Sequence, residues 1–259
     1  MDLGIEGRRA LLTGASKGMG RACAYALARE GVDITIVART EGPLHATAEA
    51  IAKETGANVT PVTADITTEH GRAAALAACP EPDILLNNAG GRKPGDFRDW
   101  TREDWISALD LMMLAPIEMI KATFDGMVSR RYGRIINIAS RSVKIAQAEL
   151  GLSNGARSGL VGFCAGLART GVAQNVTINT LLPGPFDSDA QREHVEGLVV
   201  PGGPSFEEIW AQRASKNPAN RFGRTEEIGA YFAFLASAHA GFITGQALLI
   251  DGGDYPGTF

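Results

Sequence analysis

The stretch Ala10-Leu11-Leu12-Thr13-Gly14-Ala15-Ser16-Lys17-Gly18-Met19-Gly20 decides the fold of this chain. It joins a short apolar run to a glycine-rich loop, and a segment with helical periodicity follows. Gly14 permits a tight turn, Gly18 lets the backbone come close to a ligand, and Gly20 allows the helix to pack against the strand. Free amides at the start of a helix attract phosphate. The stretch therefore predicts a dinucleotide-binding loop, with cofactor contacts from Gly14, Ser16, Lys17, Gly18 and Met19.

Short apolar runs alternate with amphipathic segments along the whole chain. Most of these runs lack polar alternation, which is typical of strands that are covered on both faces. Strand–helix alternation of this kind builds a parallel sheet with right-handed crossovers. We expect seven strands, at residues 10–12, 34–37, 59–62, 84–86, 134–138, 177–181 and 247–250.

The composition argues against several classes of protein. The 259 residues carry a formal net charge of −4 with scattered lysines and arginines, so we expect neither a nucleic acid nor a membrane as partner. Three cysteines lie far apart and four histidines fall in unrelated segments, so we expect no metal site. We see no signal peptide and no apolar run near the roughly 20 residues that span a bilayer. These features predict a cytoplasmic protein.

The end of the second strand indicates which dinucleotide binds. A site that selects NAD places a carboxylate there to hold the 2′-hydroxyl of the ribose. This chain has Ala38 and Arg39 at that point, and Lys17 lies in the glycine loop. Two cations and no carboxylate favour a 2′-phosphate. We therefore predict NADP(H) as the cofactor.

Further motifs follow the other strands. These are Asp65-Ile66, Asn87-Asn88-Ala89-Gly90, Pro183-Gly184 with Ser188 further on, and Ile250-Asp251-Gly252-Gly253. With the glycine loop, they resemble the motifs of the short-chain dehydrogenase/reductase family, and of 3-oxoacyl-acyl-carrier-protein reductases within it, over essentially the whole chain. The resemblance implies Asp65 at the adenine with Ile66 also in the cofactor site, Asn88, Ala89 and Gly90 at the adenosine ribose, and Pro183, Gly184 and Ser188 near the nicotinamide.

The same resemblance implies four catalytic positions, of which this chain keeps one. Family members commonly use an Asn, a Ser, and a Tyr with a Lys four residues later. Ser140 fills the Ser position, whereas Met112, Ser153 and Arg157 replace the Asn, the Tyr and the Lys. A Ser hydroxyl is a far weaker acid than a phenol, and an Arg stays charged and cannot relay a proton. We expect catalytic roles for Ser140, Ser153 and Arg157 in an atypical mechanism.

Two functions remain open on these residues. In the first, the chain is an NADP(H)-dependent oxidoreductase in which Ser140 and Ser153 bind a carbonyl and Arg157 stabilises the oxyanion. The proton then comes from water or from Lys144 or Glu149. In the second, hydride transfer is lost, and the fold serves an elimination, a cyclisation or ligand sensing, with Arg157 as a clamp for an anion. A protein that uses the fold for assembly alone is a third interpretation. The intact nicotinamide-end motifs favour the first function.

We predict one α/β domain over residues 1–259, a doubly wound parallel seven-stranded sheet (Rossmann fold) in the order 3-2-1-4-5-6-7. A long irregular segment, at about residues 186–217, is expected to be a substrate lid with one helix near residues 206–214. The resemblance implies a homotetramer, with helices at residues 104–128 and 151–169 at one interface and the C-terminal strand at another. It also implies a small-molecule carbonyl or alcohol as the substrate.

Overall fold

The computed structural model describes residues 1–258 and is built around a seven-stranded parallel sheet. Its strands run in the order β3-β2-β1-β4-β5-β6-β9, as predicted for the seven strands of this sheet. Their bounds are Arg9–Thr13 (β1), Asp33–Ala38 (β2), Val59–Thr63 (β3), Ile84–Asn88 (β4), Gly133–Ile138 (β5), Val176–Pro183 (β6) and Ala247–Ile250 (β9). All six pairings are parallel, so the carboxyl ends of the strands share one edge.

Burial along the strands explains why their sequences lack alternation. Every residue of β5 and β6 is buried, because helices cover both faces of the middle of the sheet. The outer strands β3 and β9 contain no buried residue and are half-buried or exposed. Pro61 in β3 fits this position, because a proline lacks the N–H that an inner strand would need.

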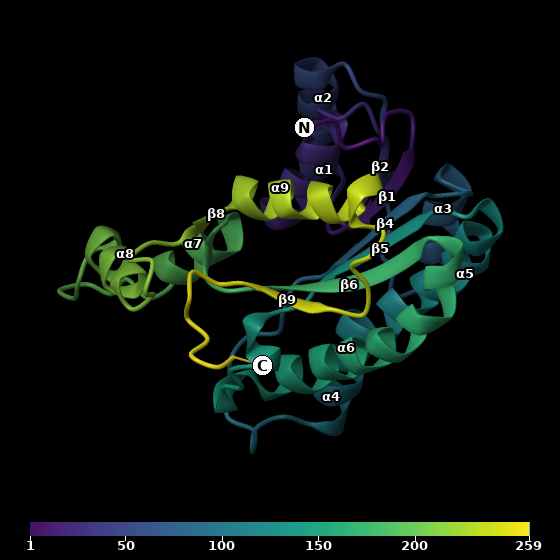
Figure 1. Cartoon of the computed structure of the whole chain (residues 1–259). Helices are drawn as coiled ribbons and strands as arrows, with labels where there is room; N and C mark the ends of the chain where they lie inside the picture. Colours follow the sequence, from purple (N-terminus) through teal and green to yellow (C-terminus); the bar gives the residue numbers. More distant parts are fainter. Residues whose placement is uncertain (259) are drawn as a thin grey trace.

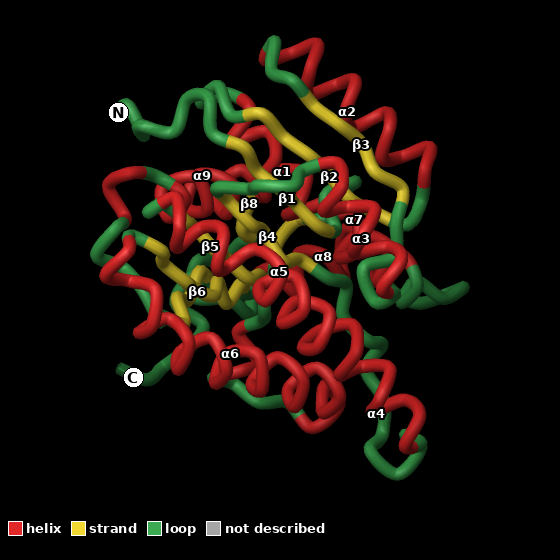
Figure 2. Tube along the Cα trace, turned by 90° about the vertical axis from the view of Figure 1, so that its right-hand side faces the viewer, coloured by secondary structure: helices red, strands yellow, loops and turns green. Residues whose placement is uncertain are grey.

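Helices form a layer on each face of the sheet (Figures 1 and 2). One core includes residues of α1 (Gly18–Ala28), α2 (Glu41–Thr55) and α9 (Thr225–Ala236). The other includes residues of α3 (Glu69–Ala78), α5 (Ala115–Arg130) and α6 (Gly151–Gly171). Helix α9 approaches α1 closely at Gly229, where a Cβ atom would lie 2.7 Å from the carbonyl oxygen of Ala22. The dinucleotide fold that the glycine loop predicts is therefore present with its layers in place.

The helix expected at residues 104–128 is interrupted. Helix α4 covers Arg102–Leu109, one turn of π-helix covers Asp110–Leu114, and α5 then continues from Ala115. A π turn inserts an extra residue and redirects the side chains that follow it. The interruption includes Met112, which occupies one of the four predicted catalytic positions.

The segment after β6 is more regular than the sequence indicated. Besides α8 (Phe206–Ser215), near the predicted helix, it contains α7 (Asp189–Glu196), which was not predicted. A two-residue strand β7 (Phe186–Asp187) also pairs in parallel with β8 (Gly223–Arg224). This pairing ties the two ends of the segment together, and α7 and α8 extend beyond the sheet on one side of the molecule (Figure 1).

Candidate active site

The glycine loop is locked to the end of β4 by close contacts. Gly14 and Gly18 have φ angles of +60° and +58°, which favour glycine. A Cβ atom on Gly14 would clash with the backbone carbonyl of Asn88. The side-chain amide of Asn88 donates to the Gly14 carbonyl at 2.9 Å, and its backbone N–H donates to the Thr13 hydroxyl at 3.0 Å. The Asn88 predicted at a ribose therefore also holds the loop in shape.

A groove with a volume of about 380 Å³ runs along the carboxyl edge of the sheet. Most of the predicted cofactor residues line it: Gly14, Ser16, Lys17, Gly18, Met19, Arg39, Asp65, Ile66, Asn88, Ala89, Gly90 and Ser188. Pro183 and Gly184 do not line this groove and lie at the end of β6, where the Gly184 N–H donates to the Ile250 carbonyl at 3.0 Å. The groove brings together residues from the ends of five strands, β1 to β5, and from α7, which the sequence motifs did not predict.

Asp65 and Arg39 set the charge at one end of the groove. Burial opposes ionisation of the Asp65 carboxyl, but hydrogen bonds from the N–H and hydroxyl of Thr67 and the charge of Arg39 outweigh it and lower its pKa. The carboxylate is thus ionised and oriented. Arg39 itself is exposed, so its guanidinium is available to an anion from solvent. Within residues 33–40, which end the second strand and turn into α2, the only carboxylate is that of Asp33 at the opposite end of β2.

Arg157 is buried and bound to the strand ends. Nη1 donates to the carbonyls of Ile138 and Ala139 at 2.9 and 2.8 Å, and Nη2 donates to the Ala89 carbonyl at 3.1 Å. These contacts use three of the five N–H groups that an Arg offers. Burial lowers the pKa of the guanidinium to about 10, so it remains charged at neutral pH. Arg157 also lines the groove, where its cation bridges the ends of β4 and β5.

Ser153 lies deep in the site against the π turn. Its hydroxyl is 3.6 Å from the sulfur of Met112, a weak acceptor, and both side chains are buried. Gly91 comes close on another side, since a Cβ atom there would lie 3.7 Å from the Ser153 oxygen. Two of the three residues that replace the family pattern, Met112 and Ser153, are therefore in contact where the start of α6 meets the π turn, and Arg157 lies four residues further along α6.

Ser140 follows β5 and caps a short 3₁₀ turn at Arg141–Val143. Its oxygen accepts a hydrogen bond from the Ser142 N–H at 3.1 Å, which leaves its own O–H able to donate. The next residues meet the C-terminal tail. Arg141 forms an ion pair with Asp254, and the Lys144 ammonium lies 5.5 Å from the centre of the Tyr255 ring. The tail therefore covers this loop, which the sequence offered no pattern to predict.

The two proposed proton donors differ in their surroundings. Lys144 is half-buried beside Tyr255, whereas Glu149 is exposed. His194, on α7, is also exposed. Among residues 1–258, no three His, Cys, Asp or Glu side chains gather as they would around a metal ion. In the same residues, no helix combines the length and the apolar character that a membrane crossing requires.

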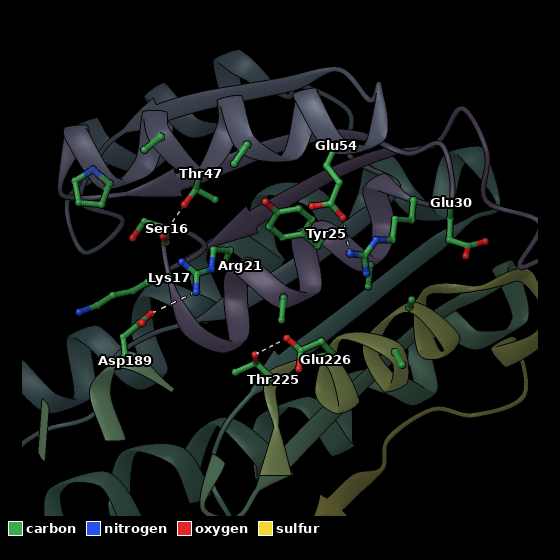
Figure 3. Close-up of a pocket in the computed structure, with 18 of the residues that line it drawn as sticks. Ser16, Lys17, Arg21, Tyr25, Glu30, Thr47, Glu54, Asp189, Thr225 and Glu226 are labelled. Atoms are coloured by element: carbon green, nitrogen blue, oxygen red, sulfur yellow. Dashed lines mark hydrogen bonds and ion pairs between the residues drawn. The ribbon is translucent and has the colours of Figure 1, made fainter. Parts of the chain in front are cut away.

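Sequence reasoning missed the contacts that α7 makes with the glycine loop. A wide cleft of about 1070 Å³ between α1, α2 and α9 shares Ser16 and Lys17 with the groove (Figure 3). Asp189 and Glu193 of α7 also line this cleft. Ser188 is a residue type that caps helices, and a run of charged residues follows it. This pattern indicates a helix, but it does not indicate where the helix packs.

Comparisons with known proteins agree with this geometry. The family model described as enoyl-(acyl carrier protein) reductase matches residues 14–254. 3-Oxoacyl-(acyl-carrier-protein) reductase FabG of Vibrio harveyi is 32% identical over 257 residues, covering 98% of this chain and 99% of the relative. NADPH-dependent reductase BacG of Bacillus subtilis is 32% identical over 251 residues, covering 95% and 97%.

A solved structure extends the comparison to three dimensions. L-Sorbose reductase from Gluconobacter frateurii, in complex with NADPH and L-sorbose, superposes with a TM-score of 0.96 at 29% identity and covers 99% of this chain and 100% of that chain. The sheet order, the glycine loop, the strand-end motifs and these relatives have a single explanation. The chain belongs to the short-chain dehydrogenase/reductase family.

Proposed function

We propose that this chain is an NADP(H)-dependent oxidoreductase that transfers a hydride between the nicotinamide and a carbonyl or alcohol, with a non-standard proton donor. The groove carries the proposal, because it joins the glycine loop to Arg39 and to the buried Arg157 in one continuous surface. The names of two relatives support the cofactor, since BacG is an NADPH-dependent reductase and the sorbose reductase is complexed with NADPH.

The residues around the groove fit a dinucleotide phosphate. Lys17, the N-cap residue of α1, makes no side-chain cap, and the Gly18 N–H donates to Asp189, so the other amides of the first turn are available to a pyrophosphate. Arg39 and Lys17 would hold the 2′-phosphate, and Asp65 the adenine. The adenosine ribose would lie against Asn88, Ala89 and Gly90. The nicotinamide would lie near Pro183, Gly184 and Ser188. When bound, the reduced nicotinamide supplies the hydride.

The chain's own part in the chemistry is to polarise the carbonyl. Ser140 and Ser153 each keep a hydroxyl proton with at most a weak sulfur acceptor, so each can donate to a substrate oxygen. Arg157 acts from beneath, as a fixed positive charge whose fork is mostly engaged by strand-end carbonyls. A preorganised cation in a buried site stabilises a developing oxyanion without reorganisation. We assign Arg157 an electrostatic role in which its proton does not move.

The proton must come from outside this set. A buried Arg with a pKa near 10 does not exchange its proton at neutral pH, and an unassisted Ser is too weak an acid. Of the two side chains proposed, Lys144 is half-buried at the same edge as Ser140, and Glu149 is exposed. We propose water or Lys144 as the donor.

The alternative function remains non-redox chemistry or ligand sensing on the same fold. It is favoured by the replacement of three of the four catalytic positions, at Met112, Ser153 and Arg157. In this case Arg157 would use its two remaining N–H groups on an anionic ligand.

We also propose that the protein forms a homotetramer. Trp105 of α4, Leu114 of the π turn and Phe163 of α6 are exposed on the helices expected at one interface, and Phe242 is exposed before β9. Exposed large apolar side chains of this kind are common where subunits meet. A cytoplasmic location stays a prediction.

The test is oxidation of NADPH followed at the nicotinamide absorbance with a panel of ketones. The panel includes L-sorbose and a 3-oxoacyl thioester, because relatives are named for them. Consumption of NADPH with formation of the matching alcohol is the expected result. Tight binding of NADPH without consumption on any member would favour the non-redox alternative.

A further inference from the structure

Two carboxylates of α7 bind the groups with which the glycine loop would hold phosphates. The Gly18 N–H donates to Oδ2 of Asp189 at 3.1 Å. Lys17 Nζ forms an ion pair with Oε1 of Glu193 at 2.8 Å. Arg21 Nη2 lies 3.8 Å from the same oxygen of Asp189, and Figure 3 shows Lys17, Arg21 and Asp189 around the start of α1. Asp189 and Glu193 are four residues apart, so they project from one face of α7 toward the loop.

The phosphates of the cofactor would bind the same groups. The amide of Gly18 belongs to the first turn of α1, where a dinucleotide of either kind places its pyrophosphate. Lys17 is one of two cations that distinguish a 2′-phosphate from a 2′-hydroxyl. A single N–H cannot donate at full strength to a carboxylate and to a phosphate together, and a paired ammonium attracts a second anion less strongly.

We propose that Asp189 and Glu193 are internal competitors of the cofactor and tune its selectivity: Asp189 weakens the binding of both dinucleotides, and Glu193 weakens the binding of the 2′-phosphorylated one alone. The proposal rests on the NADP(H) site proposed above. It goes beyond that site because it assigns specificity to two acidic residues of the α7 segment. Binding of the cofactor displaces both carboxylates and frees α7 from the loop.

The size of the effect follows from exposure. The side chains of Lys17 and Glu193 are 52% and 64% exposed, and those of Arg21 and Asp189 are 44% and 41% exposed. Exposed pairs contribute up to about 1 kcal/mol, so removing one carboxylate should change a dissociation constant by about two- to fivefold. Because the expected change is small, the proposal is tested by which ligands bind more tightly to each variant.

The experiment measures binding by calorimetry, with no turnover required. NADP⁺, NAD⁺ and adenosine 2′,5′-bisphosphate are titrated into the wild type, Asp189→Asn and Glu193→Gln. Glu196→Gln is the matched control, because it removes one charge from an exposed position on the same helix. Thermal melts of all variants confirm that α7 is folded, which the Ser188 cap should preserve.

We expect Asp189→Asn to bind NADP⁺ and NAD⁺ more tightly, by about two- to fivefold in each case. Glu193→Gln should tighten NADP⁺ and adenosine 2′,5′-bisphosphate by a similar factor and leave NAD⁺ unchanged. The proposal is wrong if either variant binds NADP⁺ no more tightly than the wild type. It is also wrong if Glu196→Gln gives the same gain, because the effect would then be one of net charge.

Release of α7 from the glycine loop can be followed by the fluorescence of Trp210. The Arg192 guanidinium of α7 lies 5.0 Å from the centre of the Trp210 ring of α8. Displacing α7 should change the emission of Trp210 on addition of NADP⁺, which does not absorb in that range, and Trp210→Phe should remove the change. If NADP⁺ still produced the same emission change in Trp210→Phe, the change would not come from Trp210, and this would contradict displacement of α7. Binding results stand whether or not the chain reduces a carbonyl, so they separate this proposal from the proposed reaction.

Discussion

Replacing Arg157 with Met tests whether this residue is a structural cation rather than a free clamp. The variant keeps a similar length and removes three hydrogen bonds to the carbonyls of Ala89, Ile138 and Ala139. Hydrogen bonds that involve a charged group each contribute about 1.5–3 kcal/mol, which for the three bonds makes about 4.5–9 kcal/mol. Part of this stabilisation is offset, because burial lowers the pKa of the guanidinium to about 10.

This lowering of the pKa corresponds to roughly 3 kcal/mol against the charged form. The difference between these terms predicts that Arg157→Met lowers the free energy of unfolding by about 3 kcal/mol. Arg157→Lys keeps the charge and can remake one or two of the bonds, so we expect about half that loss. Arg169→Met is the control, because it removes the same charge from an exposed position of the same helix.

Urea unfolding followed by circular dichroism, at one fixed protein concentration, measures these differences. The control should stay within about 0.5 kcal/mol of the wild type. If Arg157→Met did so as well, the hydrogen bonds to the strand ends would carry no stability. The interpretation of Arg157 as a structural cation would then be wrong, and a free clamp for an anion would be favoured.

Three further predictions concern the active site, the glycine loop and the carboxylate of Glu227. The double variant Ser153→Tyr with Arg157→Lys restores a phenol beside an ammonium and should raise the turnover of simple ketones by about 100-fold, measured as NADPH consumption; no gain would mean that the site no longer aligns a hydride acceptor. Gly14→Ala should abolish NADPH binding in calorimetry while it costs about 1–3 kcal/mol of stability, because the loop needs a positive φ and has no room for a Cβ atom; binding at wild-type strength would contradict the assigned loop. Hydrogen bonds from Arg221 and from the backbone of residue 224 lower the pKa of Glu227 from 4.5 to about 2, so its contribution to stability is complete above pH 4.5 and is lost as the pH falls toward 2. Glu227→Gln should therefore lose less stability than the wild type between pH 4.5 and 2 in acid-unfolding curves, and equal losses would refute this.

The sheet could be predicted from the sequence because its signals are local. Apolar runs set the inner strands, and the glycine loop identifies the first strand–helix unit. The π turn at Met112 had no such signal, since its residues are compatible with a continuous helix and its contacts with α6 join distant parts of the sequence. Strands β7 and β8 are two residues long, too short for any periodicity. Helix α7 lay in a segment rich in charge and Pro that seemed irregular.

The candidate site shows the same limit. The motifs indicated which residues line the groove, and most of them do. They did not indicate what those residues contact. The partners of Arg157 are backbone carbonyls, which any sequence provides. The contacts between Arg141 and Asp254, and between Lys144 and Tyr255, join positions more than 100 residues apart. Pairings at this distance depend on the course of the tail, which no local pattern records.

The central claim is that hydride transfer survives the loss of the usual Tyr and Lys. Its most direct test uses NADPH carrying deuterium at both positions of C4 of the nicotinamide, with mass spectrometry of the product alcohol from each ketone of the panel. We predict a product that carries one deuterium on the former carbonyl carbon, at a rate that Ser153→Ala lowers. NADPH that binds tightly but passes no deuterium to any ketone would contradict the claim.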